Sequence, residues 1–113
     1  MNVTTVYNEG TAVLRVEEPR LTFPILGDFA SAATDLIAKG EKRIVLDLSA
    51  VNYVDSATIG CLMDLYRQAS AAGGSLKLAG VQKRVETMLT MTGAQNFIEV
   101  HPDEPSAVKS FGA

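Results

Sequence analysis

An aspartate followed by a serine stands at the junction between a predicted strand and a predicted helix. Asp55 and Ser56 lie within VDSATIG, after the apolar run RIVLDLSAVNY and before the helix-like stretch CLMDLYRQASAAGG. A serine at this position caps the helix, which stabilises it by about 0.5–2 kcal/mol. It also suits phosphorylation, because the positive end of a helix holds a phosphate favourably. A phosphoryl group adds roughly −1.5 to −2 charges beside Asp55, enough to repel a partner that docks there.

Other kinds of chemistry find little support in the sequence. Ser56 lacks the G-x-S-x-G elbow of serine hydrolases, and the single histidine, His101, lies far along the chain. One histidine and one cysteine, Cys61, cannot supply the usual zinc ligand sets. Neither a P-loop nor a G-x-G-x-x-G fingerprint is present. We therefore expect a protein that is not an enzyme, with no metal and no cofactor, and we interpret Cys61 as a small core residue.

Composition favours one small domain that spans residues 1–113. The chain has 113 residues, of which 47% are hydrophobic, and one cysteine, which fits a reducing compartment. The start MNVTTVYNEG does not resemble a signal peptide, so we expect a cytoplasmic protein. No apolar run approaches the roughly 20 residues that span a membrane. A net charge of −3 with scattered basic residues argues against direct nucleic-acid binding.

Hydrophobic periodicity predicts alternating strands and helices. Asp28 is the predicted N-cap of the first helix and Ser56 that of the second, and Pro105 suits the first turn of a short terminal helix. The predicted strands are at 3–7, 11–16, 43–49, 75–81 and 96–100, and the predicted helices at 28–40, 57–72 and 85–93. The strand at 11–16 alternates as a half-exposed strand does, whereas 43–49 is apolar throughout, like a central parallel strand. The order predicts an α/β domain with helices packed on a mixed sheet.

The run from Ile44 to Val100 resembles a STAS domain, specifically the bacterial anti-sigma factor antagonists of sporulation and stress-response partner switching. Its most specific parts are the strand followed by DS, the connection AAGGSLKLAGV and the helix ending VETMLTMTG. The resemblance implies a SpoIIAA-like fold, with a mixed β-sheet and helices mainly on one side. It also implies a monomer or weak homodimer that works by binding.

By position, Ser56 matches the phosphoacceptor of that family and Asp55 the acidic residue before it. The implied partner is an anti-sigma factor that is also a serine-protein kinase of histidine-kinase-like ATPase fold. Phosphorylation by this kinase ends the interaction, and a serine phosphatase restores it. The chain is then a substrate of both enzymes rather than a catalyst.

The sequence departs from the family pattern in two places. After the aspartate the family has S-[ST]-G-[LI]-G, whereas this chain has SATIG, with Thr58 in place of the first glycine. We interpret Thr58 as a residue of the helix cap, with a second phosphoacceptor as the alternative. Upstream, PRLT replaces G-x-L-[DT]. The expected partner-binding residues, on or just beneath the docking surface, are Asp55, Ser56, Thr58, Ile59, Gly60 and Met63, with Thr22 and Asp28 in a second contact region. For Ile59 and Met63 the alternative is a place in the core, because both lie on the apolar stripe of the helix, and we favour the core for Met63.

Two other functions compete with the switch. One is a STAS scaffold whose serine is never phosphorylated, in a signalling assembly or beside a transporter. The other is a nucleotide- or lipid-binding STAS domain, although the sequence has no recognisable phosphate loop.

Overall fold

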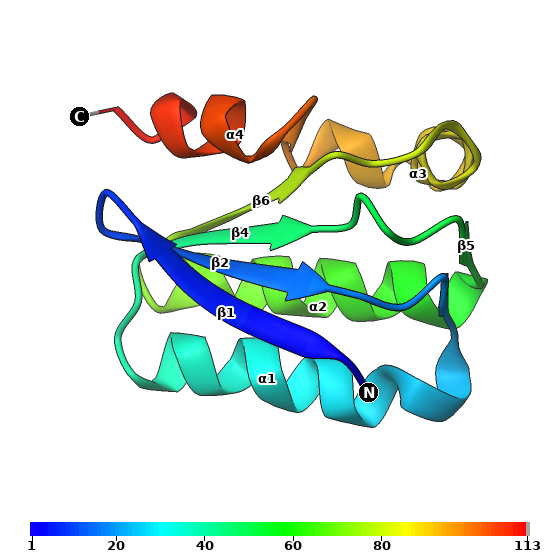
Figure 1. The fold of residues 1–113 in the computed structure, drawn as a ribbon, viewed down its shortest axis with the longest axis horizontal. Coiled ribbons are helices and arrows are strands. Elements are labelled where there is room, and N and C mark those ends of the chain that lie inside the picture. The colour runs from blue at the N-terminus through cyan, green and yellow to red at the C-terminus, as the bar shows by residue number, and fades with distance from the viewer. Residues whose placement is uncertain (113) are drawn as a thin grey trace.

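The computed structural model describes residues 1–112 and contains a mixed β-sheet with helices packed on it (Figure 1). The strands are β1 (Val3–Asn8), β2 (Thr11–Val16), β3 (Arg20–Leu21), β4 (Arg43–Asp47), β5 (Tyr53–Val54), β6 (Ser75–Ala79) and β7 (Val100–His101). The helices are α1 (Leu26–Ala38), α2 (Ser56–Ala71), α3 (Lys83–Thr92) and α4 (Glu104–Ser110), with 3₁₀ helices η1 (Phe23–Ile25) and η2 (Ala94–Asn96). The α/β class expected from the sequence is confirmed.

Five strands form the main sheet, in the order β1-β2-β4-β6-β7. β1 and β2 form an antiparallel hairpin, and every other pair in this sheet is parallel. β3 and β5 pair separately as a short parallel ribbon beyond the carboxyl ends of β2 and β4 (Figure 1). α2 starts directly after β5, so this end of the sheet positions the Asp55-Ser56 junction.

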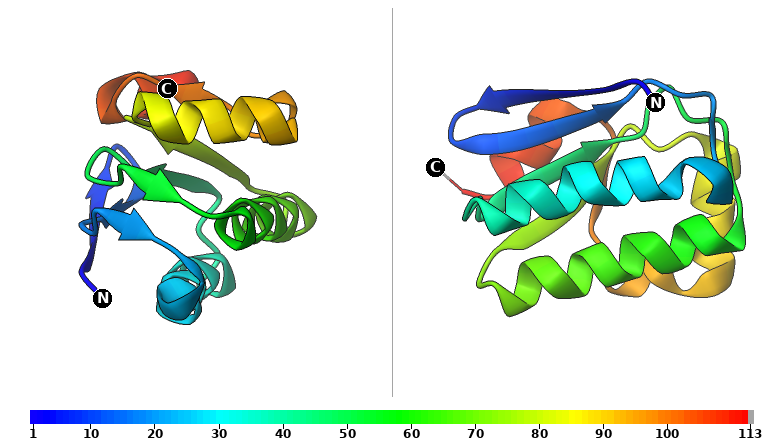
Figure 2. Two further views of the ribbon diagram at one scale, coloured as in Figure 1. Left: turned by 90° about the vertical axis from the view of Figure 1, so that its right-hand side faces the viewer. Right: turned by 90° about the horizontal axis from the view of Figure 1, so that it is seen from below.

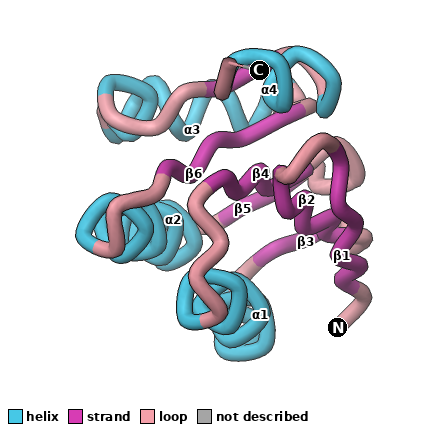
Figure 3. Tube along the Cα trace, turned by 90° about the vertical axis from the view of Figure 1, so that its left-hand side faces the viewer, coloured by secondary structure: helices cyan, strands magenta, loops and turns pink. Residues whose placement is uncertain are grey.

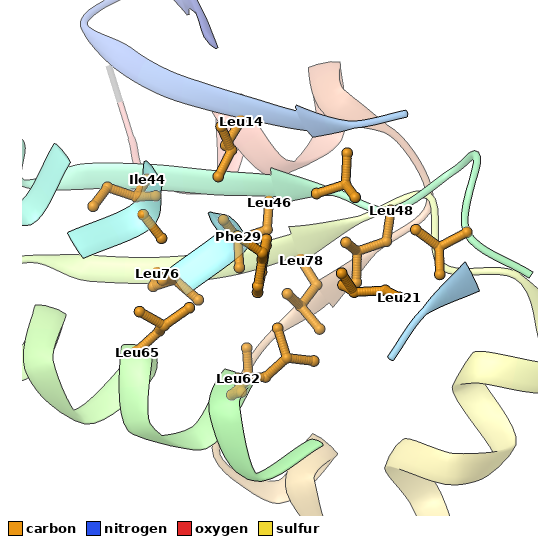
Figure 4. Packing of buried hydrophobic residues seen from close by; sticks show 14 of the residues in the cluster. Leu14, Leu21, Phe29, Ile44, Leu46, Leu48, Leu62, Leu65, Leu76 and Leu78 are labelled. Carbon is orange, nitrogen blue, oxygen red and sulfur yellow. The ribbon is translucent and has the colours of Figure 1, made fainter. Parts of the chain in front are cut away.

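The main core lies between the sheet and the pair α1 and α2, which run side by side along one face (Figure 2). Leu14, Leu46 and Leu78, from three neighbouring strands, meet Phe29 of α1 and Leu62 of α2 (Figure 4). These five side chains are fully buried, as the apolar stripes of both helices predict.

A smaller core lies on the opposite face of the sheet, beneath α4 (Figure 3). Val13, Val45 and Ala79 pack there against Ala107 and Val108 of α4. The second face explains why β4 is apolar without alternation. It also makes the expectation of a half-exposed strand at 11–16 wrong, because α4 buries Val13 completely.

Two further predictions about element boundaries are wrong. Asp28 does not cap the first helix, because α1 already starts at Leu26 after a 3₁₀ turn, which leaves Asp28 exposed in the first turn. The segment 96–100 is not a full strand: Gly93 adopts a left-handed conformation, η2 follows, and only Val100 and His101 pair with β6. Pro105 does lie in the first turn of a short terminal helix, as expected.

Candidate functional site

The N-cap of α2 is Asp55, and Ser56 is the first helical residue. Asp55 has the extended backbone of an N-cap (φ −103°, ψ 177°), and its Oδ1 accepts a hydrogen bond from the Thr58 amide at 2.9 Å. The prediction that Ser56 caps the helix is therefore wrong. The helix starts one residue earlier than expected because the acidic side chain before the serine fills the cap position.

Both carboxylate oxygens of Asp55 are held by neighbouring groups. Oδ2 accepts a hydrogen bond from the Phe23 amide at 2.9 Å, which fixes η1 against the start of α2. The Thr58 hydroxyl lies 2.7 Å from Oδ1 and 2.6 Å from the Leu21 carbonyl oxygen, and its single proton is donated to one of these two acceptors at a time. Through these hydrogen bonds, Asp55 and Thr58 connect β3, η1 and the first turn of α2.

These hydrogen bonds keep Asp55 ionised. Burial by itself would raise the pKa of Asp55, but the donors from Phe23 and Thr58 outweigh it, so the pKa lies below its ordinary value. Asp55 therefore carries a full negative charge at neutral pH, at the positive end of α2, where such a charge is stabilising.

The side chain of Ser56, in contrast, takes no part in the hydrogen bonds that hold this turn. Its side chain is exposed, and its hydroxyl forms no hydrogen bond with any of residues 1–112. A modification of this oxygen breaks no contact of the fold. The next hydroxyl along the chain, that of Thr58, is fully buried, which argues against Thr58 as a second phosphoacceptor.

A shallow groove of about 360 Å³ runs along α2 from Ala57 to Gln68, beside η1 and the start of α1, and it begins one residue after Ser56. Phe23 stands at its margin with 72% of its surface exposed, an unusual position for a phenylalanine. The residues that line the groove are Phe23, Leu26, Ala30, Ala57, Gly60, Cys61, Asp64, Leu65 and Gln68. The exposed Ser56 hydroxyl therefore lies close to a partly apolar surface.

A STAS domain model matches residues 2–107. The chain belongs to the STAS domain family. A protein of Thermotoga neapolitana, named as a candidate anti-sigma factor antagonist, is 28% identical to this STAS domain over 67 residues. The aligned region spans 59% of this chain and 59% of that relative, so the likeness covers about three fifths of the curated protein.

Solved structures show the same fold. The crystal structure of a candidate anti-sigma factor antagonist from Thermotoga maritima superposes with a TM-score of 0.84 at 21% identity, covering 96% of this chain and 92% of that one. The phosphorylated form of the Bacillus cell-fate determinant SpoIIAA superposes with a TM-score of 0.73 at 15% identity, covering 97% and 99%. The SpoIIAA-like fold expected from the sequence is confirmed.

The remaining expected partner-binding residues of this STAS domain occupy different environments. Ile59 is 5% exposed and belongs to the core, and Met63 is half-buried against that core, so neither presents its side chain fully to a partner. Gly60 lines the groove, and a methyl group added there would meet no atom within 4 Å. Thr22 is half-buried at the start of η1, and Asp28 is exposed on α1.

Sequence reasoning missed Phe23 and placed Cys61 in the core. The signal for Phe23 was an aromatic residue before Pro24 in a segment that had no assigned structure. Cys61 is half-buried: it packs against the main core, as expected in part, and also lines the groove. Burial raises the pKa of its thiol, and the Asp64 carboxylate adds to this rise, so the thiol is protonated at neutral pH.

Among residues 1–112, no cluster of three metal-ligating side chains occurs, and no helix is long and apolar enough to span a membrane.

The buried Thr58 hydroxyl can be tested by a nearly isosteric substitution. We expect Thr58→Val to lower the free energy of unfolding by about 1–2 kcal/mol, because the hydroxyl proton that the Leu21 carbonyl and the Asp55 carboxylate share is lost and a buried acceptor is left without a donor. Urea denaturation measures the change, and Thr34→Val on the exposed face of α1 provides the control with little effect. Equal stabilities of the two variants would contradict this role of Thr58.

Proposed function

We propose that this STAS domain is an anti-sigma factor antagonist whose binding to its anti-sigma factor ends when Ser56 is phosphorylated. One observation carries the proposal. Ser56 is exposed with an unbonded hydroxyl at the N-terminus of α2, whereas its polar neighbours Asp55 and Thr58 are committed to holding the fold. Adding a phosphoryl group to Ser56 therefore changes the surface without breaking a contact.

The named relatives support this proposal. The Thermotoga neapolitana relative is named for anti-sigma factor antagonism, and SpoIIAA has been solved in a phosphorylated form. The partner we propose is accordingly an anti-sigma factor that is also a serine kinase. A serine phosphatase then returns the domain to its binding state.

Electrostatics explains why the phosphorylated form would release its partner. The phosphoryl group brings roughly −1.5 to −2 charges to a site that already contains the ionised Asp55 carboxylate, with Asp64 in the adjoining groove. The helix N-terminus stabilises this charge within the domain. A partner that covers Ser56 has to remove the phosphate from water, and like charges placed opposite each other in an interface cost several kcal/mol.

Phe23 and the groove provide the apolar part of the docking surface. Phe23 is exposed, but its backbone amide is anchored on Asp55, so the ring is presented from a fixed segment. Fixed aromatic side chains contribute strongly to protein interfaces, because little conformational entropy is lost on binding. We assign partner contact to Ser56, Phe23 and Gly60, with Thr22 and Asp28 at the margin.

Two substitutions at Gly60 distinguish effects on the stability of the domain from effects on partner binding. We expect Gly60→Ala to raise the free energy of unfolding by about 0.5–1 kcal/mol, because glycine weakens a helix interior and the added methyl group meets no atom. Gly60→Leu keeps the helix but fills the groove, and it should weaken partner binding at least tenfold in calorimetry. Unchanged partner binding by a folded Gly60→Leu variant would exclude the groove from the interface.

The decisive experiment is intact-mass spectrometry of the protein purified from its host under several growth conditions. A mass increase of one phosphoryl group, mapped to Ser56 and lost in Ser56→Ala, supports the switch. If the host's anti-sigma factor copurifies but Ser56 is never modified, the domain is an interaction scaffold. Heat released on titration with GTP, ATP or anionic lipid vesicles, without any protein partner, would instead favour ligand binding.

A further inference from the structure

β1 has a long outer edge that pairs with no other strand among residues 1–112. β1 lies at one margin of the main sheet, with six residues, whereas β7 at the other margin has two. The sequence of β1, VTTVYN, contains no charged residue and no proline. Natural proteins usually protect such edges with lysine, proline or a bulge, because free backbone groups readily pair with another strand. None of these protections occurs in β1.

The hairpin determines which β1 residues point their backbone groups outward. Its turn has two residues, Glu9 and Gly10, both with positive φ (52° and 78°), as in a type I′ turn. In such a hairpin the residues flanking the turn form a hydrogen-bonded pair, and bonded pairs then recur at every second position. The Asn2 carbonyl, which accepts a bond from the Glu17 amide at 2.8 Å, follows this pattern. The even positions therefore bond to β2, and Val3, Thr5 and Tyr7 offer free backbone groups to solvent.

We propose that this edge pairs with β1 of a second copy of the chain, antiparallel and centred on Thr5. In this register Thr5 lies opposite Thr5 of the second copy, and Val3 lies opposite Tyr7. All of these residues direct their free amide and carbonyl groups outward, so each pair exchanges two backbone hydrogen bonds. The two sheets become continuous, and the two-fold symmetry closes the assembly as a dimer.

The side chains suit this register. Tyr7 is 57% exposed in the single chain, and in the dimer its ring lies beside Val3 of the second copy. Aromatic residues opposite β-branched residues, and threonine opposite threonine, are favourable cross-strand pairs worth roughly 0.2–1 kcal/mol each. The absence of charge in β1 means that no like charges meet across the two-fold axis.

Within residues 1–112, no helix covers this edge. α1 and α2 lie on one face of the sheet and α4 on the other, while β1 forms the open margin (Figure 3). Ser56 belongs to α2 and not to the pairing edge of β1. The proposal is thus independent of phosphorylation, and it predicts a module that presents two partner sites.

Sedimentation equilibrium over a range of protein concentrations tests the dimer. Thr5→Lys places two ammonium groups opposite each other on the two-fold axis, and we expect it to raise the dimer dissociation constant at least tenfold. Thr5→Val is the matched control, because it keeps a β-branched side chain at this exposed position without adding a charge. A wild-type protein that is monomeric up to about 1 mM would overturn the proposal. Equal weakening by both variants would overturn the Thr5-centred register.

Disulfide trapping tests the register directly. In a Cys61→Ser background, Thr5→Cys brings two thiols together, since Cα atoms of a hydrogen-bonded pair are about 5.5 Å apart, within disulfide range. We expect rapid formation of a covalent dimer on oxidation of Thr5→Cys and slow formation for Thr4→Cys. Circular dichroism confirms that both variants are folded. Failure of folded Thr5→Cys to crosslink faster than Thr4→Cys would overturn the proposal.

Discussion

Replacing Ser56 with aspartate is expected to weaken binding of the anti-sigma factor by about 100-fold or more, equivalent to roughly 3 kcal/mol. The substitution places a permanent negative charge at an exposed position beside the ionised Asp55 carboxylate. An interface that covers this position has to desolvate the new charge, or oppose it with a charge of its own. Isothermal titration calorimetry with the purified anti-sigma factor measures the loss.

The fold itself should tolerate the same substitution. The Ser56 hydroxyl forms no hydrogen bond with residues 1–112, and an acidic residue in the first helical turn is favourable by about 0.3–1 kcal/mol. We therefore expect Ser56→Asp to melt at the wild-type temperature or slightly above it, and Ser56→Ala to bind the partner as wild type does. Retention of full affinity by Ser56→Asp would remove the charge switch from the mechanism and leave the scaffold function.

Replacing Asp55 with alanine should have the largest effect on stability, a loss of about 2–3 kcal/mol in the free energy of unfolding. The N-cap alone contributes about 0.5–2 kcal/mol, and the Phe23 amide and Thr58 hydroxyl lose an acceptor as well. Urea denaturation measures this loss, with Asp28→Ala as a matched control because Asp28 is an exposed aspartate in the first turn of α1. If Ser56 were the true cap, Ser56→Ala would cost more than Asp55→Ala.

The Asp55 carboxylate also predicts a dependence of stability on pH. Its pKa in the folded chain lies below the ordinary value near 3.8. The folded state therefore binds its proton less readily than the unfolded state does, and the resulting stabilisation is complete above that value and lost as pH falls through the folded pKa. In Asp55→Asn this contribution is absent, so the stability difference between wild type and variant should shrink as pH falls below the ordinary value near 3.8 and through the lower folded pKa. A difference that stays constant with pH would contradict the assignment.

The sequence was informative about elements whose burial is local and periodic. The stripe of Ile59, Leu62 and Ala69 predicted α2 to within a residue at each end, and all three side chains are buried. The unbroken apolar run in β4 predicted a strand covered on both faces. The alternation at 11–16 was less reliable, because a valine on the second face of the strand does not reveal that α4, almost a hundred residues later, packs on it.

Boundaries and exposures depended on contacts that sequence patterns do not contain. Asp28 looked like a helix cap because an aspartate before an apolar stripe usually is one, but η1 with Pro24 starts the helix earlier. Phe23 looked unremarkable within an irregular segment. Its exposure follows from the Asp55 side chain, which anchors the Phe23 amide and thereby fixes the course of the backbone.

By itself, the sequence determined that a strand passes into a helix at Asp55-Ser56 and that the surrounding chain has a STAS domain pattern. It did not determine which of the three polar residues in this turn hold the fold and which one is left free. Asp55, Ser56 and Thr58 all suit the first turn of a helix. The tertiary structure decided among them, because the Phe23 amide and the Leu21 carbonyl, 32 and 37 positions away in sequence, bring their hydrogen bonds to Asp55 and Thr58 and leave Ser56 facing solvent.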